Sequence, residues 1–500
     1  MKSKLGIASI LFFIATIFLK VSGLIRDMVI AYYFGDSYIA DAYLAAFVIP
    51  NMIILFFNTG MKNAFVPSYI EAKHQNKGKH HLNQVFRSSI IISVVLSALG
   101  VIFAKFYVPI LFPEFNEHGQ EIAIFVSIIL FIAVVFVGMN SVLEAFFDSE
   151  NKFSLSIVSQ IIVVLSTIVG ALLFANKIGA YSLALGYLVG TILSLLFKFV
   201  LVFPRKLLKF RVPLQWGEIK QFYLIFIPVA LTVAIGQINL TVDNIFASYF
   251  ETGVVTYINY AKDLVHFPQA IFGVVIGTII FPTLSHAMAE KNIPGFKIGI
   301  ERGLTTLYLI LLPSIVGMMI LMPNIIELLY ERGQFSHEAT LGTAKVAYYY
   351  FGSVLFFSLH NVITKGFYTV KKGHLILTIG SLSVLLNIIL NFVFTKFFGY
   401  IGIPLASSVT AMLYVGGSFV VFNKLVNGLN LKHISFEYLK ITIAVILMGG
   451  VIYVYKPYID HLPSLLQIAF VAIPGAIIYF VFVYILKVGS LRFLLNNMKK

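Results

Sequence analysis

The chain has no cysteine and few charged residues, which make up only 11% of its 500 positions. The absence of cysteine excludes disulfides, iron–sulfur clusters and thiolate metal sites. Soluble domains carry about 25% charged residues, whereas this chain is 59% hydrophobic. A soluble protein of this composition would expose large apolar patches. The composition therefore predicts an integral membrane protein.

Motifs for nucleotide hydrolysis and metal binding are also missing. No G-x-x-x-x-G-K-[ST] run occurs, which excludes ATP hydrolysis by a P-loop, and the eleven histidines lack zinc-ligand spacing. Asp148-Ser149-Glu150 resembles a sugar-nucleotide metal motif only superficially and is interpreted as a tight turn. We therefore expect a non-enzymatic transporter without a cofactor, driven by an ion gradient, the membrane potential or the substrate gradient. The identity of a coupling ion stays open.

Fourteen apolar runs are long enough to be transmembrane helices, because about 20 residues cross the roughly 30 Å hydrocarbon core. They cover residues 5–33, 39–70, 85–112, 120–147, 153–175, 180–203, 219–249, 256–287, 298–322, 341–369, 374–397, 400–424, 437–456 and 463–487. The first run resembles a signal peptide, but it continues past Lys20 and Arg26 and is interpreted as the first membrane helix. The sequence thus predicts an all-α polytopic fold with about 14 transmembrane helices.

The net charge of +15 follows membrane topology rather than a nucleic-acid-binding face. Lysine and arginine gather in alternate connectors between the apolar runs, with 25 on one side and 6 on the other. Positively charged connectors stay in the cytoplasm. The count therefore predicts a multi-pass protein of the cytoplasmic membrane with both termini in the cytoplasm, and no nucleic-acid partner.

A duplicated block links the first apolar run to the seventh. The repeated pairs are Asp27–Phe34 with Asp243–Phe250, Pro50-Asn51 with Pro268-Gln269, and Ala64–Pro67 with Ile279–Pro282. Six runs separate the copies, so both halves have the same orientation. This arrangement predicts two six-helix lobes related by an axis along the membrane normal, around a central cavity. The predicted domains are an N-terminal lobe at 1–210, a C-terminal lobe at 211–430 and two extra helices with a tail at 431–500.

Ionisable residues inside the apolar runs mark the candidate substrate site, because charge at membrane depth is costly and signals function. The candidates are Lys20, Arg26, Asp27, Asp41, Asn51, Lys62, Asp243, Lys262 and Asp263. Arg26 and Asp27 are adjacent, and neighbours at i,i+1 do not face each other on a helix. We therefore expect each to find its partner on another span, with Asp41 pairing with Arg26 or Lys20.

Some of these charges have a second interpretation. Lys20 and Arg26 can extend to the membrane interface, as long basic side chains do, and Lys62 can cap a helix end near Gly60. Three further charged residues near the predicted cytoplasmic boundary are interpreted as interface anchors: Glu144, Lys198 and Lys365.

The second lobe carries acidic residues that are too short to reach the interface. Asp243 repeats Asp27, and Lys262-Asp263 lies where the second run has Ala and Leu. For Asp243 and Asp263 a paired or cavity-facing position is favoured. We expect Lys262 and Asp263 to close the opposite lobe.

Cations in a membrane cavity suit an amphiphile with an anionic phosphate head. Such a head loses its hydration in the low-dielectric centre, and Arg or Lys can replace that hydration with charge-assisted hydrogen bonds. Acidic neighbours keep the empty cavity from being strongly positive and provide an exchangeable partner for the released cation.

The order of several motifs resembles the MurJ (MviN) lipid II flippase family. In the first half the matching segments are Val21–Asp27, Phe34-Gly35, Ala40–Tyr43, Ile49–Asn51 and Ala64–Pro67. Later in the chain they are Ile245–Ala247, Tyr260-Ala261, Phe267-Pro268, Gly277–Ile279, Phe281–Ser285 and Gly366–Tyr368. The resemblance covers residues from about 15 to 425. It implies the fold of the multidrug/oligosaccharidyl-lipid/polysaccharide exporter superfamily, with the last two helices forming a groove for a lipid tail.

Family positions carry over residue by residue. The resemblance identifies Arg26 and Asp27 with the family's cavity arginine and adjoining aspartate, and Asp41 with its second-span aspartate. A further cavity arginine is Lys20 here, which keeps the charge but loses the planar bidentate fork. Two other family arginines fall on Ile54 and on Asp263 beside Lys262. The predicted clamp for the head group is therefore thinner than the family's and is weighted towards the N-terminal lobe.

These observations predict a secondary-active flippase that carries undecaprenyl-pyrophosphate-linked peptidoglycan precursor, lipid II, outward by alternating access. Its expected partners are that lipid-linked glycan, membrane lipids and the cell-wall synthesis machinery. The first alternative is a flippase for another polyprenyl-linked polysaccharide repeat unit. The second is a cation-coupled multidrug exporter, which should favour acidic over basic cavity residues. A polytopic glycosyltransferase would need a large external loop with paired acids, and the outer connectors are short.

Overall fold

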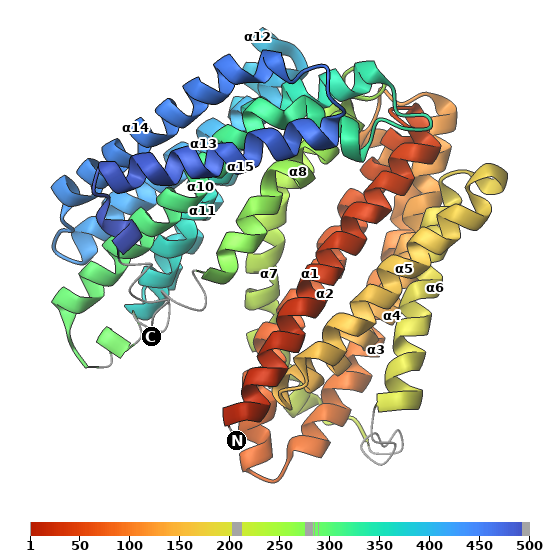
Figure 1. The fold of residues 1–500 in the computed structure, drawn as a ribbon. Coiled ribbons are helices and arrows are strands. Elements are labelled where there is room, and N and C mark those ends of the chain that lie inside the picture. The colour runs from red at the N-terminus through yellow and green to blue at the C-terminus, as the bar shows by residue number, and fades with distance from the viewer. Residues whose placement is uncertain (1, 203–212, 276–283, 285, 289, 493–500) are drawn as a thin grey trace. The chain divides into compact units, whose positions relative to one another are not determined.

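Long helices account for nearly all of the regular structure in the computed structural model (Figure 1). The structure describes residues 2–202, 213–275, 284, 286–288 and 290–492. Within these residues there are fourteen α-helices and no strand, which confirms the all-α prediction. The repeated motif at 279–282 and the family motifs at 277–283 and 285 lie outside the described residues.

Each predicted apolar run coincides with one helix, and the described part of the eighth ends at Val275. The first seven are α1 Lys2–Phe34, α2 Tyr38–His74, α3 Gly78–Leu111, α4 Glu117–Ser149, α5 Phe153–Ile178, α6 Tyr181–Phe197 and α7 Trp216–Ala247. The others are α8 Val254–Val275, α10 Ile293–Leu329, α11 His337–Thr369, α12 Gly373–Phe398, α13 Gly402–Leu425, α14 Leu431–Tyr455 and α15 Ser464–Ile485. A π-helical turn, η1 Lys198–Val202, extends α6, and short 3₁₀ turns follow α12 and α14.

Membrane-spanning character follows from length and hydropathy. Ten stretches of the described chain are long and apolar enough to cross a bilayer, and one of them, Gly373–Leu425, contains both α12 and α13. At 1.5 Å rise per residue, the 37 residues of α2 extend about 55 Å, which exceeds the roughly 30 Å hydrocarbon core. The protein is therefore a multi-pass membrane protein whose longer helices project beyond the apolar layer.

The chain divides into two compact units. Unit 1 comprises residues 1–256 with 332–336. Within it α4 packs against α2, α3, α5 and α6, and is therefore its central helix (Figure 1). α1 packs against α5 and α2, while α7 packs against α2 and α3. Aromatic and aliphatic side chains of α2, α3, α4 and α7 form one continuous hydrophobic core in this unit.

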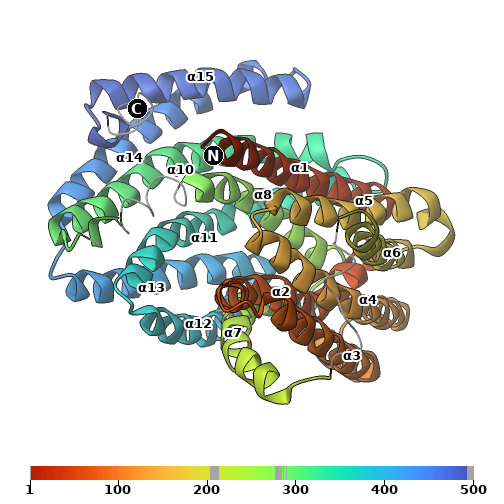
Figure 2. The ribbon, with the colours of Figure 1, turned by 90° about the horizontal axis from the view of Figure 1, so that it is seen from below.

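Unit 2 comprises residues 257–331 and 337–500. α10 packs against α11, and α13 packs against both α11 and α12. The last two helices, α14 and α15, pack against each other and against α10, and Figure 2 shows α15 at the edge of this group. The predicted domain limits stay a prediction. They are placed by the duplication in the sequence, whereas the two units are defined by the compactness of the structure.

Segment 332–336 of unit 1 contacts the C-terminal end of α1 through backbone atoms. The N–H of Gln334 donates to the carbonyl oxygen of Tyr32 at 3.0 Å. Gly35 and Gly333 both have positive φ, at 57° and 62°. A Cβ on Gly35 would collide with the Gln334 carbonyl, and one on Gly333 with the Tyr32 carbonyl. Glycine is thus required at both positions for this close approach, which holds segment 332–336 against the end of α1.

Candidate functional site

Arg26 and Asp27 form an ion pair with each other on α1. The Nε and Nη2 of Arg26 donate to Oδ1 of Asp27 at 2.9 and 2.7 Å. Asp27 is buried, while the Arg26 side chain keeps 33% exposure. The prediction that adjacent residues would not pair is wrong here. The i,i+1 rule describes the directions of Cβ atoms, and arginine's long stem lets the guanidinium turn back to its neighbour.

Asp41 caps the start of α8 instead of pairing with a cation of α1. Its Oδ2 accepts from the Gly253 N–H at 2.6 Å, and its Oδ1 accepts from the Thr256 N–H at 2.8 Å and the Thr256 hydroxyl at 2.7 Å. The prediction that Asp41 pairs with Arg26 or Lys20 is therefore wrong. A carboxylate is stabilised at a helix N-terminus by the unpaired N–H groups and the helix dipole, so Asp41 joins α2 to the first turn of α8.

Replacing Asp41 with alanine should lower the stability of the protein by about 1–2 kcal/mol, since the buried N-terminus of α8 loses its capping carboxylate. The thermal unfolding midpoint of the purified full chain measures this. Ser37→Ala is a matched control at the same end of α2, because the Ser37 side chain makes no capping bond there. An Asp41→Ala midpoint equal to that of Ser37→Ala would contradict the capping role.

The other predicted site residues are distributed along several helices. Lys20 is exposed on α1, and Asn51 is half-buried on α2. Asp243 is buried on α7 in unit 1. In unit 2, Asp263 is exposed on α8, and the buried Lys262 places its Nζ 5.5 Å from the ring centre of Tyr350. Their roles in substrate binding stay predictions.

Lys62 is the predicted site residue with the most acidic surroundings. Its Nζ lies 3.4 Å from a Glu144 oxygen and 3.4 Å from an Asp148 oxygen, so it bridges α2 to α4. The interpretation of Lys62 as a helix cap near Gly60 is wrong, because its ammonium binds two side chains of α4 rather than carbonyl groups of its own helix.

Glu144 binds a second cation from the opposite direction. The Nζ of Lys198 donates to Glu144 at 2.9 Å and to the amide oxygen of Asn140 at 2.6 Å. Lys198 is completely buried and Glu144 nearly so. The interpretation of both residues as interface anchors is therefore wrong. Lys198 also begins the π-helical turn η1, and such turns are common where a helix is adjusted for a specific function.

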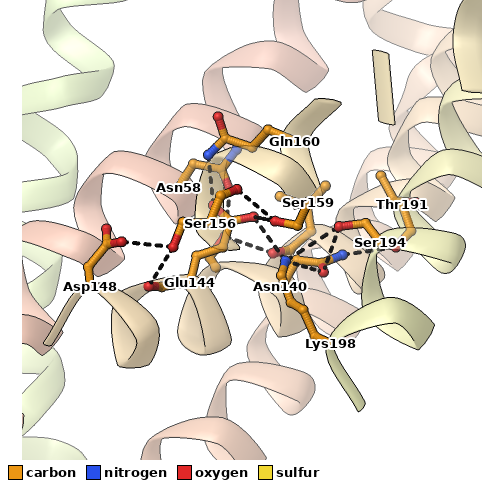
Figure 3. Close-up of polar contacts among 12 residues, drawn as sticks. Asn58, Asn140, Glu144, Asp148, Ser156, Ser159, Gln160, Thr191, Ser194 and Lys198 are labelled. Carbon is orange, nitrogen blue, oxygen red and sulfur yellow. Dashed lines mark hydrogen bonds and ion pairs between the residues drawn. The ribbon is translucent and has the colours of Figure 1, made fainter. Parts of the chain in front are cut away.

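Side chains of α5 donate further hydrogen bonds to the carboxylates of Glu144 and Asp148 (Figure 3). Glu144 accepts hydrogen bonds from Ser159 at 3.1 Å and from Gln160 at 2.8 Å. Asp148 accepts one from Ser156 at 2.7 Å. We call Lys62, Glu144, Asp148 and Lys198, with their polar neighbours on α4, α5 and α6, the four-charge cluster. Burying charge is tolerated only with such pairing and hydrogen bonding, so the cluster fixes the relative positions of α2, α4, α5 and α6.

Arg26 and Lys62 lie at different levels of unit 1. Arg26 is eight residues before Phe34, the last residue of α1, or about 12 Å from that end of the helix. Lys62 is 24 residues after Tyr38, the first residue of α2, or about 36 Å from the same end of the bundle. About 24 Å of helix therefore separates their backbones. One pyrophosphate therefore cannot contact both cations at once.

A family model that describes the lipid II flippase MurJ matches residues 30–472. The chain belongs to the MurJ family. The probable lipid II flippase MurJ of Aquifex aeolicus is 28% identical over 489 residues, covering 96% of this chain and 94% of its own length. Its counterpart in Thermotoga maritima is 26% identical, with 97% and 98% coverage. The lipid II flippase MurJ of Burkholderia cenocepacia is 28% identical, with 80% coverage of each chain.

Solved structures agree with the family. A lipid II flippase MurJ in an inward closed conformation matches with a TM-score of 0.82 and 26% identity, over 95% of this chain and 98% of that one. An inward-facing multidrug transporter of the MATE family matches with a TM-score of 0.69 and 12% identity, over 82% and 94%. The second match shows similarity of fold alone.

This MurJ family member has an apolar groove in unit 2. The groove encloses about 680 Å³ and is lined by α10, α14 and α15. Its walls include Leu309, Pro313, Met448, Val471, Gly475 and Phe480. Most of the lining side chains are aliphatic or aromatic, so the groove presents a mainly apolar surface.

Proposed function

We propose that this protein flips lipid II, the undecaprenyl-pyrophosphate-linked peptidoglycan precursor, from the inner to the outer leaflet of the cytoplasmic membrane. The observation that carries the proposal is the Arg26–Asp27 pair inside an apolar helix of a MurJ family member. A partly exposed guanidinium whose Nε and Nη2 both donate to one oxygen of Asp27 can exchange that carboxylate for a phosphate, which it can bind through two parallel N–H groups. Buried Asp27 keeps the empty site close to neutral.

Transport by this protein is secondary-active and follows alternating access. The inside-negative potential contributes about 2.3 kcal/mol per charge per 100 mV, and it favours outward movement of an anionic head group. A coupling ion can add to this driving force. No covalent step on the substrate is required.

The groove on α10, α14 and α15 takes the polyprenyl tail. Burying each CH₂ of the tail away from water is worth about 0.8 kcal/mol, but lipid provides the same environment, so the groove guides the tail rather than holding it tightly. The head group of the substrate then binds to unit 1, and its polyprenyl tail binds to unit 2. Both termini face the cytoplasm, where the cell-wall synthesis machinery delivers the precursor.

Complementation tests this function. Depleting the host's own lipid II flippase and expressing this chain should restore growth, and Arg26→Ala should not. Arg26→Lys should restore growth poorly, since the loss of one charge-assisted hydrogen bond, about 1.5–3 kcal/mol, slows transport tenfold or more. Lys105→Ala is a control, because Lys105 is an exposed cation on α3. Immunoblots of the membrane fraction establish equal amounts of each variant.

Two outcomes would contradict the proposal, the first in its substrate and the second in its phosphate contact. One is a wild-type chain that reaches the membrane without restoring growth, while it rescues the export of a different polyprenyl-linked glycan. The other is Arg26→Lys working as well as wild type, which would remove the bidentate phosphate contact from the mechanism and leave a simple requirement for positive charge.

A further inference from the structure

The four-charge cluster lies where several helices of unit 1 end together. Asp148 is next to the last residue of α4, Phe153 begins α5, and α6 ends at Phe197 just before Lys198. Lys62 is on α2 about 18 Å before its last residue, His74. The distribution of basic residues assigns this end of the helices to the cytoplasm. The cluster is therefore near the leaflet from which a lipid-linked precursor starts.

The two lysines of the cluster are bound very differently. Lys198 has 0% side-chain exposure, and its ammonium is held by Glu144 at 2.9 Å and by Asn140 at 2.6 Å. Lys62 has 28% exposure, and both of its carboxylate contacts are 3.4 Å long. Long contacts and partial exposure make Lys62 the cation that can leave its carboxylates at the lower cost.

Both carboxylates keep hydrogen-bond donors when Lys62 leaves. Glu144 keeps Lys198, Ser159 and Gln160 as donors. Asp148 keeps the Ser156 hydroxyl at 2.7 Å and is 14% exposed, so water can reach it. Lys62 can therefore exchange partners without leaving a buried charge unsatisfied, which is the condition that keeps the cost of such an exchange low.

We propose that Lys62 is a separate binding site for the pyrophosphate of a polyprenyl-linked substrate at the cytoplasmic end, with Asp148 and Glu144 as the positioning residues that hold it and compete for it. This site rests on the proposed function and adds a first stage to it. The head group exchanges with Asp148 on Lys62, and then moves the length of about 24 Å of helix towards Arg26. Because Asp148 regains Lys62 when the phosphate leaves, the same carboxylate drives release.

Competition by Asp148 gives this site a signature that a structural ion pair lacks. If the Lys62–Asp148 pair were only structural, replacing either residue would weaken the pair, and both replacements would impair the binding of phosphate. In a competitive pair, removing Lys62 weakens phosphate binding, and removing the charge of Asp148 strengthens it. An asparagine in place of Asp148 would still accept the Ser156 hydroxyl, so Asp148→Asn changes the charge and little else.

Binding of geranyl pyrophosphate to the purified full chain in detergent provides the test, with titration calorimetry as the readout and with Arg26→Ala as the common background, so that the proposed Arg26 site does not contribute. Lys62→Met should weaken binding about tenfold, the worth of one charge-assisted hydrogen bond. Asp148→Asn should tighten binding about twofold to fivefold, the worth of a partly exposed ion pair. The double variant should match Lys62→Met, because Asp148 acts only through Lys62.

Lys73→Met is the matched control on the same helix. Lys73 forms an ion pair with Glu150 at 2.6 Å and is 56% exposed, and its removal should leave binding of geranyl pyrophosphate unchanged. In cells, Asp148→Asn should flip more slowly although it binds more tightly, because release is slower. This opposition of affinity and turnover would not arise from a loss of folding.

The outcomes separate this site from the proposed function. Equal affinities with and without Lys62→Met in the Arg26→Ala background would overturn the site, even if the wild-type chain complements a flippase depletion. Weaker binding by Asp148→Asn would also overturn it, since Asp148 would then be structural. A chain that shows the expected affinity pattern but fails to complement would overturn lipid II as the substrate and leave the pyrophosphate site standing.

Discussion

Replacing Glu144 with glutamine is expected to destabilise unit 1 by about 3–5 kcal/mol, the usual cost of removing one partner of a buried ion pair. Lys198 would keep Asn140 and Ser194 as neighbours but would lose the carboxylate that balances its charge. Lys62 would lose less, because it still contacts Asp148. The expected loss of stability therefore comes mainly from the desolvation of the completely buried Lys198 ammonium, which no carboxylate would then balance.

The double variant Glu144→Gln with Lys198→Met separates this cause from loss of packing. Removing both charges should regain most of the stability, as replacement of buried ion pairs by apolar groups is often neutral or better. Thermal unfolding of the purified chain measures each variant. Glu150→Gln is the control, because it removes the exposed ion pair with Lys73, worth about 0–1 kcal/mol, and leaves an amide oxygen that can still accept the hydrogen bond from the Tyr69 hydroxyl. A double variant no more stable than Glu144→Gln would contradict the explanation.

The helices could be predicted from the sequence because each depends on local composition alone. A run of about 20 apolar residues between charged connectors is sufficient to specify a span, and all fourteen predicted runs coincide with helices. The predicted helix ends are less accurate where a helix continues beyond its apolar run. α3 begins at Gly78, seven residues before the predicted run at 85–112, because its first two turns consist mostly of polar residues, which a search for apolar runs does not detect.

The partners of the charged residues could not be predicted in the same way. Lys198 and Glu144 are 54 positions apart in the sequence, and a cation near a helix end fits an interface anchor as well as a buried pair. One pattern in the sequence does indicate these partners. Asn140 and Glu144 are four residues apart on α4, as Ser194 and Lys198 are at the end of α6, so each pair marks one polar helix face. Two polar faces in apolar helices indicate a shared contact.

Asp41 illustrates a second limit of sequence interpretation. Its three hydrogen bonds come from Gly253 and Thr256, which are 212 and 215 positions away. A carboxylate in the first turn of α2 is consistent with stabilising its own helix, with pairing to a cation, or with capping another helix. Only the approach of the first turn of α8, whose residues 254–256 belong to unit 1, selects the third, and no local pattern contains that information.

The duplicated halves differ in what precedes their repeated aspartate. Asp27 on α1 has the adjacent Arg26 as an ion-pair partner, whereas Asp243 on α7 follows the buried Val242. Both aspartates are buried. The repeat therefore preserved the position of an acid and not the cation next to it. This difference supports a head-group site weighted towards the N-terminal half, and the location of the four-charge cluster in unit 1 supports it further.

Replacing Gly186 with leucine should separate α5 from α6 and cost about 3 kcal/mol or more. Ser182, Gly186 and Gly190 repeat every four residues on α6, the small-residue pattern that lets membrane helices approach closely. A Cβ on Gly186 would lie 2.7 Å from the Ser166 carbonyl oxygen and 2.9 Å from the Thr167 Cα. Both are backbone atoms of α5, so no side chain can move aside to make room.

Separation of these helices should also disrupt the four-charge cluster, because α5 supplies Ser159 and Gln160 and α6 leads directly into Lys198. The unfolding midpoint and the binding of geranyl pyrophosphate should therefore both decline in Gly186→Leu. Gly417→Leu on α13 is the matched control, since Gly417 also lies within a helix, and a Cβ there would meet no neighbouring atom of the described chain within 4 Å. If both leucine variants unfold at the wild-type midpoint, close contact of α5 and α6 does not stabilise unit 1.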